Sequence, residues 1–246
     1  MSNEDILNSS FYKGTLAGKT AVATGAGRGI GKALVRDIRL WIDRPTYVLV
    51  NNAGIARIDA VVYQHDMVAW SQIMNTNLNG PVALSYQVLP DMVSAGEGII
   101  ISIGSRSAIY AMPFSNAHAV AKTGLLRFHE NLEHELQGRG IYNYYIVPSN
   151  VETSILDTVY AIDEESFRHS ERIRQTVYNL NNCEKTSADR VANVCVMLAA
   201  EKAAGVLSGR YVDTEGGFGA IWEDIQSGTE SRCVMEGLYQ LRMDMM

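Results

Sequence analysis

The chain has 246 residues, of which 47% are hydrophobic and 20% charged, a balance typical of a globular domain and not of a disordered or fibrous chain. Its formal net charge of −6 and the lack of a basic run argue against a nucleic-acid or anionic-membrane surface. The three cysteines are widely spaced, so we expect no disulfide framework, no metal site and a reducing compartment, the cytoplasm. No apolar run approaches the roughly 18 residues of a membrane span, and no membrane insertion is expected.

Short apolar runs alternate with helical patterns along the whole chain, which predicts a parallel sheet covered by helices on both faces. We expect strands within residues 20–24, 47–54, 98–105, 141–150 and 209–217. We expect helices within residues 25–38, 66–92, 116–136 and 187–200, and in part of 157–182. Ser187 is the expected N-cap of the helix at residues 187–200. The chain is expected to form a single domain over residues 1–246, with a leader at 1–15 and a C-terminal extension at 218–246.

The first expected strand is followed by the pattern Gly25-x-x-x-Gly29-x-Gly31 at the start of a helix. Glycines allow a tight turn and let a phosphate approach backbone N–H groups at a helix N-terminus, where the helix dipole favours an anion. The strand before the turn and the helix after it favour a nucleotide-binding loop. A tight turn that binds nothing is the alternative.

Seven short motifs follow one another in a characteristic order. They are TGAGRGIG, NNAG, NTNLNG, IISIGSRSA, AHAVAK, VPSNVET and LSGRYVDTEGG. With them the chain resembles the short-chain dehydrogenases/reductases from about residue 16 to residue 217. The resemblance implies a Rossmann-like, doubly wound α/β sheet, NAD or NADP as cofactor, and a small-molecule alcohol or ketone as substrate. It also implies a homodimer or homotetramer.

The same resemblance assigns four catalytic positions, which are Asn77, Ser105, His118 and Lys122. In the family an Asn anchors a relay water, a Ser orients the substrate oxygen, and a Lys lowers the pKa of a catalytic Tyr. Ser102 and Ser107 are neighbours that complicate the serine assignment. Ser105 is preferred because it lies 13 residues before position 118, which is the family's spacing.

The resemblance also assigns the residues that contact the cofactor, and Lys122 belongs to both sets. These residues are Gly25, Arg28, Gly29, Ile30, Gly31, Asn52, Ala53, Gly54, Lys122 and Thr153. Thr153 matches the position that hydrogen-bonds the nicotinamide carboxamide. Arg28 is placed to meet a 2′-phosphate, which tilts the expectation slightly to NADP.

Position 118 departs from the family pattern, because it holds His where a Tyr is expected. Residues 118 and 122 still share one helical face. An imidazole is shorter than a phenol, its ordinary pKa is about 6.5 and not about 10, and a nearby Lys cation favours its neutral form. A neutral imidazole can still donate one N–H. His118 is therefore either a slow acid/base, an inactivating change or a sequence error.

A second departure is the short interval between the first two motifs. Only 19 residues separate Gly31 from Asn51, whereas one βαβ unit takes about 30 residues or more. The second and third strands of the fold are therefore expected to be absent, which would leave the first strand at a sheet edge. Asp43 is an alternative ribose-binding acid, although it lies only 12 residues past Gly31.

Three functional hypotheses follow, and the first is an oxidoreductase whose activity is impaired. The second is a non-catalytic Rossmann-like protein that binds a partner or itself, and the third is the product of an incomplete gene model. Three further patterns are given structural interpretations. The charged HENLEH segment (129–134) predicts a solvated helix face. The leucines of residues 125–136 predict core or subunit interface, and Tyr142, Tyr144 and Tyr145 predict strand packing.

Overall fold

The computed structural model describes residues 12–27, 30, 46–62, 67–148, 150–151, 164–200, 202–214 and 218–226. Its centre is a five-stranded, all-parallel sheet in the order β1-β2-β3-β4-β5. The strands are β1 (Thr20–Ala23), β2 (Thr46–Asn51), β3 (Gly98–Ile103), β4 (Ile141–Val147) and β5 (Tyr211–Asp213). All five lie within the segments expected from sequence, apart from Thr46, which begins β2 one residue early. The α/β fold is confirmed.

Among the described strands β1 forms one edge of the sheet, and it pairs directly with β2, from Thr20 opposite Thr46 to Ala23 opposite Val50. This edge position is the one expected if the second and third strands of the fold are absent. Residues 31–45, where the shortened junction and Asp43 fall, lie outside the described residues.

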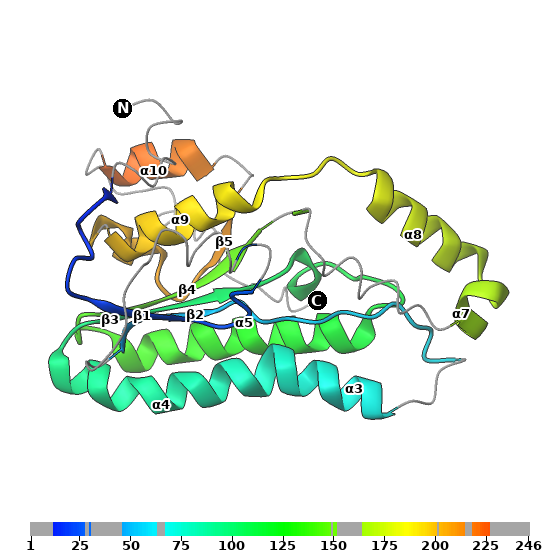
Figure 1. Ribbon diagram of the computed structural model, residues 1–246, viewed down its shortest axis with the longest axis horizontal. Coiled ribbons are helices and arrows are strands. Elements are labelled where there is room, and N and C mark those ends of the chain that lie inside the picture. The colour runs from blue at the N-terminus through cyan, green and yellow to red at the C-terminus, as the bar shows by residue number, and fades with distance from the viewer. Residues whose placement is uncertain are drawn as a thin grey trace, which may run out of the picture.

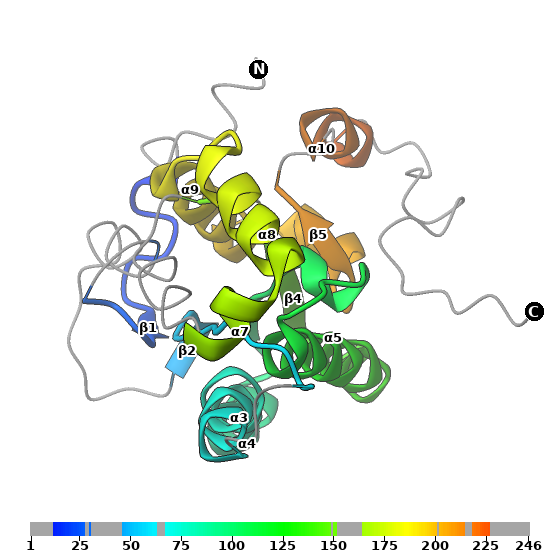
Figure 2. The ribbon, with the colours of Figure 1, turned by 90° about the vertical axis from the view of Figure 1, so that its right-hand side faces the viewer.

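Helices cover both faces of the sheet, as Figures 1 and 2 show. On one face lie α3 (Met67–Met74), a π-helical turn at Asn75–Asn79, α4 (Gly80–Ala95) and α5 (Asn116–Leu136). On the other lie α9 (Ala188–Ala200) and α10 (Phe218–Gln226). A separate arm carries α7 (Glu164–His169) and α8 (Glu171–Asn182), the helical parts of residues 157–182. Ser187 accepts a hydrogen bond from Arg190 N at 3.2 Å, as expected of an N-cap.

The strands alternate strictly between these two helical layers because successive side chains of a strand point to opposite faces. Val48, Ile101 and Ile146 pack toward α9 and α10, and Leu49 and Ile100 toward α4 and α5. α10 opens the expected C-terminal extension and is part of this core, with its Trp222 fully buried. No helix among the described residues is long and apolar enough to cross a membrane.

One face of α5 is buried along its whole length. Leu125, Leu132 and Leu136 belong to the core, so this stripe is core in the single chain. Tyr144 and Tyr145 of β4 are also fully buried, which confirms their interpretation as strand packing.

The expectation of a solvated face for HENLEH is wrong at His129, which is 0% exposed. Its Nδ1 lies 2.8 Å from Asn143 Oδ1 and its Nε2 lies 2.7 Å from Ser102 Oγ. Glu133 accepts a hydrogen bond from Asn143 Nδ2 at 2.9 Å and so extends the network toward the surface. The burial of His129 could not be predicted from its charged neighbours in the sequence, because it results from the packing of α5 on the sheet.

Burial lowers the pKa of His129 from 6.5 to about 4. Between these values the unfolded chain binds more protons than the folded chain, so stability falls as pH falls through this window. We expect His129→Gln to remove this pH dependence. Between pH 7 and pH 4 the free energy of unfolding of the variant should therefore rise by about 3 kcal/mol relative to that of the wild type. Urea unfolding at several pH values measures it. His169→Gln on the exposed α7 is the matched control, and an unchanged pH dependence in His129→Gln would contradict the assignment.

Candidate active site

A cavity of about 500 Å³ lies where β2, β3 and β4 end, beneath α8. The carboxyl ends of parallel strands are where such sheets bind ligands. Three of the four expected catalytic residues, Ser105, His118 and Lys122, line this cavity. The expected cofactor residues Gly25, Ile30, Asn52, Ala53 and Gly54 line it as well. Arg28, Gly29, Gly31 and Thr153 lie outside the described residues.

The glycine turn after β1 is locked against the NNAG segment after β2. Gly25 has φ +65°, and a Cβ there would lie 2.9 Å from Ala53 Cα, so only glycine fits. Asn52 Nδ2 donates to Thr24 O at 2.9 Å. Thr24 Oγ1 in turn accepts from the backbone N–H groups of Asn52 (3.1 Å) and Ala53 (3.0 Å). The two motifs therefore form one rigid corner of the cavity.

Asn77 lies in the π-helical turn and is fully buried. Its Oδ1 accepts from Ile55 N at 2.9 Å and its Nδ2 donates to Ile55 O at 2.7 Å. The side chain thus fixes the segment that follows NNAG. Asn77 does not itself line the cavity, whereas its neighbour Thr76 does.

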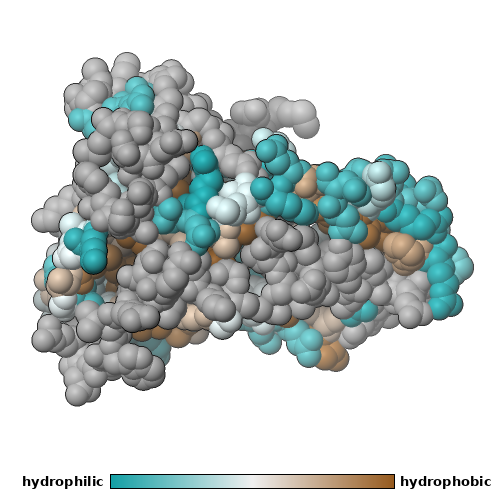
Figure 3. Space-filling model, turned by 45° about the horizontal axis from the view of Figure 1, so that its top comes forward, coloured by the Kyte–Doolittle hydropathy of each residue, from teal (hydrophilic) through white to brown (hydrophobic). Residues whose placement is uncertain are grey.

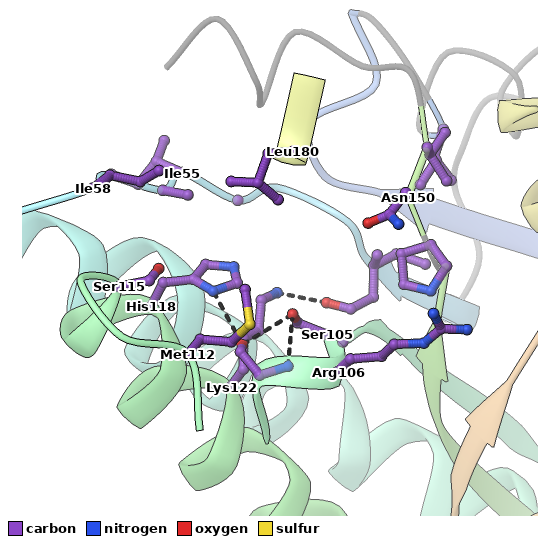
Figure 4. A pocket seen from close by; sticks show the side chains of 18 of the residues that line it. Ile55, Ile58, Ser105, Arg106, Met112, Ser115, His118, Lys122, Asn150 and Leu180 are labelled. Carbon is purple, nitrogen blue, oxygen red and sulfur yellow. Dashed lines mark hydrogen bonds between the residues drawn. The ribbon is translucent and has the colours of Figure 1, made fainter. Parts of the chain in front are cut away.

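A chain of hydrogen bonds joins Ser105 to His118 through Ser107. Ser107 Oγ donates to Ser105 Oγ at 2.9 Å, and His118 Nδ1 lies 3.2 Å from Ser107 Oγ. Ser107 N also donates to Ser105 Oγ at 3.2 Å. Figure 4 shows this chain below the ring of His118, whose other nitrogen points to the side of Ile55 and Leu180. Ser107, which the sequence offered only as an alternative to Ser105 for the catalytic serine, therefore links Ser105 to His118.

Burial sets the charge of both titratable groups. It lowers the pKa of His118 to about 3, and the positive charge of Lys122 contributes to that decrease. Burial also lowers the pKa of Lys122 from 10.5 to about 8. Its Nζ donates to Ile103 O at 2.6 Å. Near neutral pH the site therefore holds a neutral imidazole one helical turn from an ammonium group.

Tyr145 is a residue of this site that the motifs did not indicate. Its hydroxyl donates to Lys122 O at 3.1 Å and accepts from Ser105 N at 3.0 Å. Its ring packs so close to Gly104 that a Cβ there would lie 2.1 Å from it. Tyr145 thus ties the loop that carries Ser105 to the helix that carries Lys122. The only sequence signal was a large aromatic residue in a buried strand.

The profile of the short chain dehydrogenase family matches residues 44–163. A nodulation protein G of Azospirillum brasilense is 30% identical over 186 residues, which cover 76% of this chain and 71% of that protein. A short chain dehydrogenase of Pseudocercospora fijiensis is 28% identical over 281 aligned positions, which cover 93% of this chain and 90% of that protein. Since the whole chain has only 246 residues, that relative contains positions with no counterpart here.

Solved structures show the same fold. One is a putative NAD(P) dependent gluconate 5-dehydrogenase from Beutenbergia cavernae with bound NADP. It superposes with a TM-score of 0.65 at 23% identity, over 83% of this chain and 98% of its own. A short chain dehydrogenase/reductase family oxidoreductase from Burkholderia thailandensis has a TM-score of 0.64 at 21% identity, over 89% of this chain and 96% of its own.

Removing the Tyr145 hydroxyl tests whether it holds the site together. Tyr145→Phe leaves the half-buried Ser105 N–H without its acceptor, so we expect a loss of about 1–2 kcal/mol in the free energy of unfolding. Tyr144→Phe is the matched control, because the buried Tyr144 hydroxyl has no hydrogen-bond partner among the described residues. Urea unfolding measures both. Equal losses in the two variants would contradict a bridging role.

Proposed function

Because the chain belongs to the short-chain dehydrogenase/reductase family, we propose that it is an NAD(P)-dependent oxidoreductase that acts slowly on an alcohol/ketone pair. The observation that carries the proposal is the Ser105–Ser107–His118 hydrogen-bond chain, which ends beside Lys122 in the cavity. It supplies a route for a proton at the place where the family's motifs put the substrate oxygen.

The residues present fit the nicotinamide end of the cofactor. The rigid corner formed by Gly25, Asn52 and Ala53 offers a close backbone approach to the cavity, which Asn150 and Val151 also line. The bound nicotinamide would supply or accept a hydride at its C4 carbon. The expected contacts of Arg28, Gly29, Gly31 and Thr153 stay part of the proposal, as does the slight preference for NADP.

In the direction of alcohol oxidation, His118 Nε2 accepts the hydroxyl proton of the substrate. The arrangement with Ser107 donating to Ser105 makes His118 Nδ1 the donor to Ser107, which leaves Nε2 free to accept. As Nε2 takes the proton, Nδ1 passes its own to Ser107. Ser107 passes its proton to Ser105, and Ser105 releases one to water in the cavity. The imidazole stays neutral throughout, as its low pKa requires.

Ketone reduction runs the same chain in reverse. Both hydroxyls rotate, so that Ser105 donates to Ser107 and Ser107 donates to Nδ1, which leaves Nε2–H to protonate the substrate oxygen. The Lys122 ammonium group stabilises negative charge that develops on that oxygen. The reaction is slow because the imidazole reaches less far than the phenol for which the helix position is spaced.

A non-catalytic binding protein is the second candidate, and the pKa of His118 favours it. An imidazole with a pKa of about 3 is a weak base, so the site can hold ligands without turning them over. The alignment with the Pseudocercospora fijiensis protein is longer than this chain. It supports the further proposal that a segment present in that relative is absent here. Whether the gene model is incomplete is decided by resequencing the transcript.

We also propose self-association and a cytoplasmic location. Tyr86 and Val93 of α4 and Val120 of α5 are exposed apolar side chains on the helical layer that covers one face of the sheet, which supports a homodimer or homotetramer. Cys183 and Cys195 are free thiols, in keeping with a reducing compartment.

Transfer of deuterium from 4-deuterated NADH and NADPH to ketones, followed by mass spectrometry, tests the proposal. We expect slow transfer by the wild type. His118→Phe should lower the rate roughly 100-fold because it removes the acid. His118→Tyr should raise it about tenfold or more, since a phenol restores the reach of the acid. A wild-type rate in His118→Phe, or no transfer by the wild type and His118→Tyr alike, would contradict the proposal.

The pH dependence of the reduction rate distinguishes proton transfer through a neutral His118 from acid catalysis by a protonated histidine. We expect no step near pH 6.5, because His118 stays neutral down to about pH 3. The rate should instead fall above about pH 8, where Lys122 loses its proton and its positive charge. Initial rates between pH 5 and pH 9 measure it. A titration step near pH 6.5 that disappears in His118→Tyr would contradict the neutral-imidazole mechanism.

A further inference from the structure

The cavity has two ends of different chemistry. Asn150 and Arg106 lie at one end, and Ile55 and Ile58 lie at the other, as Figure 4 shows. The backbone beside Lys185 lies near the Asn150 end, because the adjacent Thr186 N donates to Asn150 O at 2.8 Å, whereas Lys185 Nζ reaches Leu180 O. Since the residues expected to hold the cofactor precede Ile55 or neighbour Asn150, the end beyond His118 remains for the substrate.

Apolar side chains surround His118 on that side. Ile55, Ile58, Met112, Pro113 and Leu180 line the cavity there, together with the hydroxyls of Ser115 and Thr176. In Figure 4, Ile55, Ile58 and Leu180 lie across the cavity from Ser105 and Lys122. A substrate whose oxygen meets Ser105 and His118 therefore places the rest of its carbon skeleton against aliphatic side chains.

The arm that closes this end is also held by apolar contacts. Ile173 and Val177 of α8 are buried against Ile58 and Ala60, with Leu180 packed on the same cluster. Figure 3 shows that the outer face of the arm is largely hydrophilic while hydrophobic side chains gather along its underside. The amphipathic helix thus presents its apolar face to the substrate end, whereas Tyr178 on its outer face is 62% exposed.

Each basic group among the described lining residues already has a partner, and Lys185 is the one whose partner, Leu180 O, lies at this end. Arg106 pairs with Asp213, with Nη2 3.2 Å from Oδ2. Lys185 Nζ donates to Leu180 O at 2.5 Å, and Lys122 Nζ donates to Ile103 O. Among the described lining residues none is acidic. A carboxylate on the far side of the substrate would therefore lose its hydration and would have to compete with Leu180 O for the Lys185 ammonium group.

From these observations we propose that the substrate is a neutral, apolar ketone or secondary alcohol whose hydrocarbon part occupies the pocket between Ile55, Ile58 and Leu180. The proposal rests on the oxidoreductase function and deepens it by naming the substrate class. It excludes substrates that carry a carboxylate or phosphate on the side of the carbonyl facing α8.

A matched pair of ligands tests this substrate class without turnover. 2-Octanone and 7-oxooctanoate share a methyl ketone and chain length, and differ only in a terminal methyl or carboxylate group. Binding is measured by isothermal titration or ligand-observed NMR on the full chain, with and without NADPH. We expect 2-octanone to bind about tenfold more tightly or better, a difference of about 1.4 kcal/mol, since the carboxylate loses its hydration among aliphatic side chains and Lys185 is already bonded to Leu180 O.

Leu180→Arg should reverse this preference by placing a cation against the hydrocarbon end. Tyr178→Arg adds the same charge to the outer face of the same helix and should leave the preference unchanged. If Leu180→Arg fails to fold, Thr176→Arg places the cation one helical turn earlier on the cavity-lining side.

Equal or tighter binding of 7-oxooctanoate to the wild type would overturn the proposed substrate class, and so would a failure of either ligand to bind when NADPH does. These outcomes are independent of deuterium transfer, which decides the oxidoreductase function itself. A substrate-class failure is therefore distinguishable from a failure of the proposed activity.

Discussion

The packing of one face of α5 against β3 and β4 is the constraint on which the site depends. That face carries His118 and Lys122 near the start of the helix, then Leu125, Leu132 and Leu136 in the core. The Lys122 ammonium group donates to Ile103 O, and the Tyr145 hydroxyl contacts Lys122 O and Ser105 N. The same packing that buries the leucines therefore fixes the distance between the helix and the serine loop.

This arrangement has an electrostatic consequence. A buried cation and a half-buried imidazole share one helix face, where desolvation lowers the pKa of both and the charge of Lys122 lowers the pKa of His118 further. A tyrosine at position 118 would gain from the nearby cation, because its ionised form is an anion. The charged form of histidine is a cation, which the nearby Lys122 disfavours. The neutral imidazole can therefore release a proton from one ring nitrogen only if its other nitrogen receives one. Ser107, 3.2 Å from His118 Nδ1, is placed to make that exchange.

Much of the fold was predictable from the sequence, since buried parallel strands are short apolar runs and the long amphipathic helix at residues 116–136 has a clear period. Ser105, His118 and Lys122 were predictable because a motif fixes their spacing along the chain. Ser107, Tyr145 and His129 were not predictable in their roles. Each has at least one contact with a residue 11 or more positions away, as in the pair of His129 with Ser102, 27 positions apart. Such contacts exist only once helix and sheet have packed.

Because the interval between the glycine turn and NNAG is short, cofactor binding depends on fewer elements of the sheet. With β1 at the sheet edge and paired directly to β2, the described contacts for a nicotinamide come from the glycine corner and the ends of β2, β3 and β4. An oxidoreductase built in this way must hold its cofactor with this half of the site.

Titration of the purified chain with NADPH and NADH, followed by nicotinamide fluorescence and melting temperature, tests that requirement most directly. We expect saturable binding with a rise in melting temperature, and loss of both in Gly25→Ala, where a Cβ would meet Ala53. A cooperative melt that neither nucleotide shifts would contradict it.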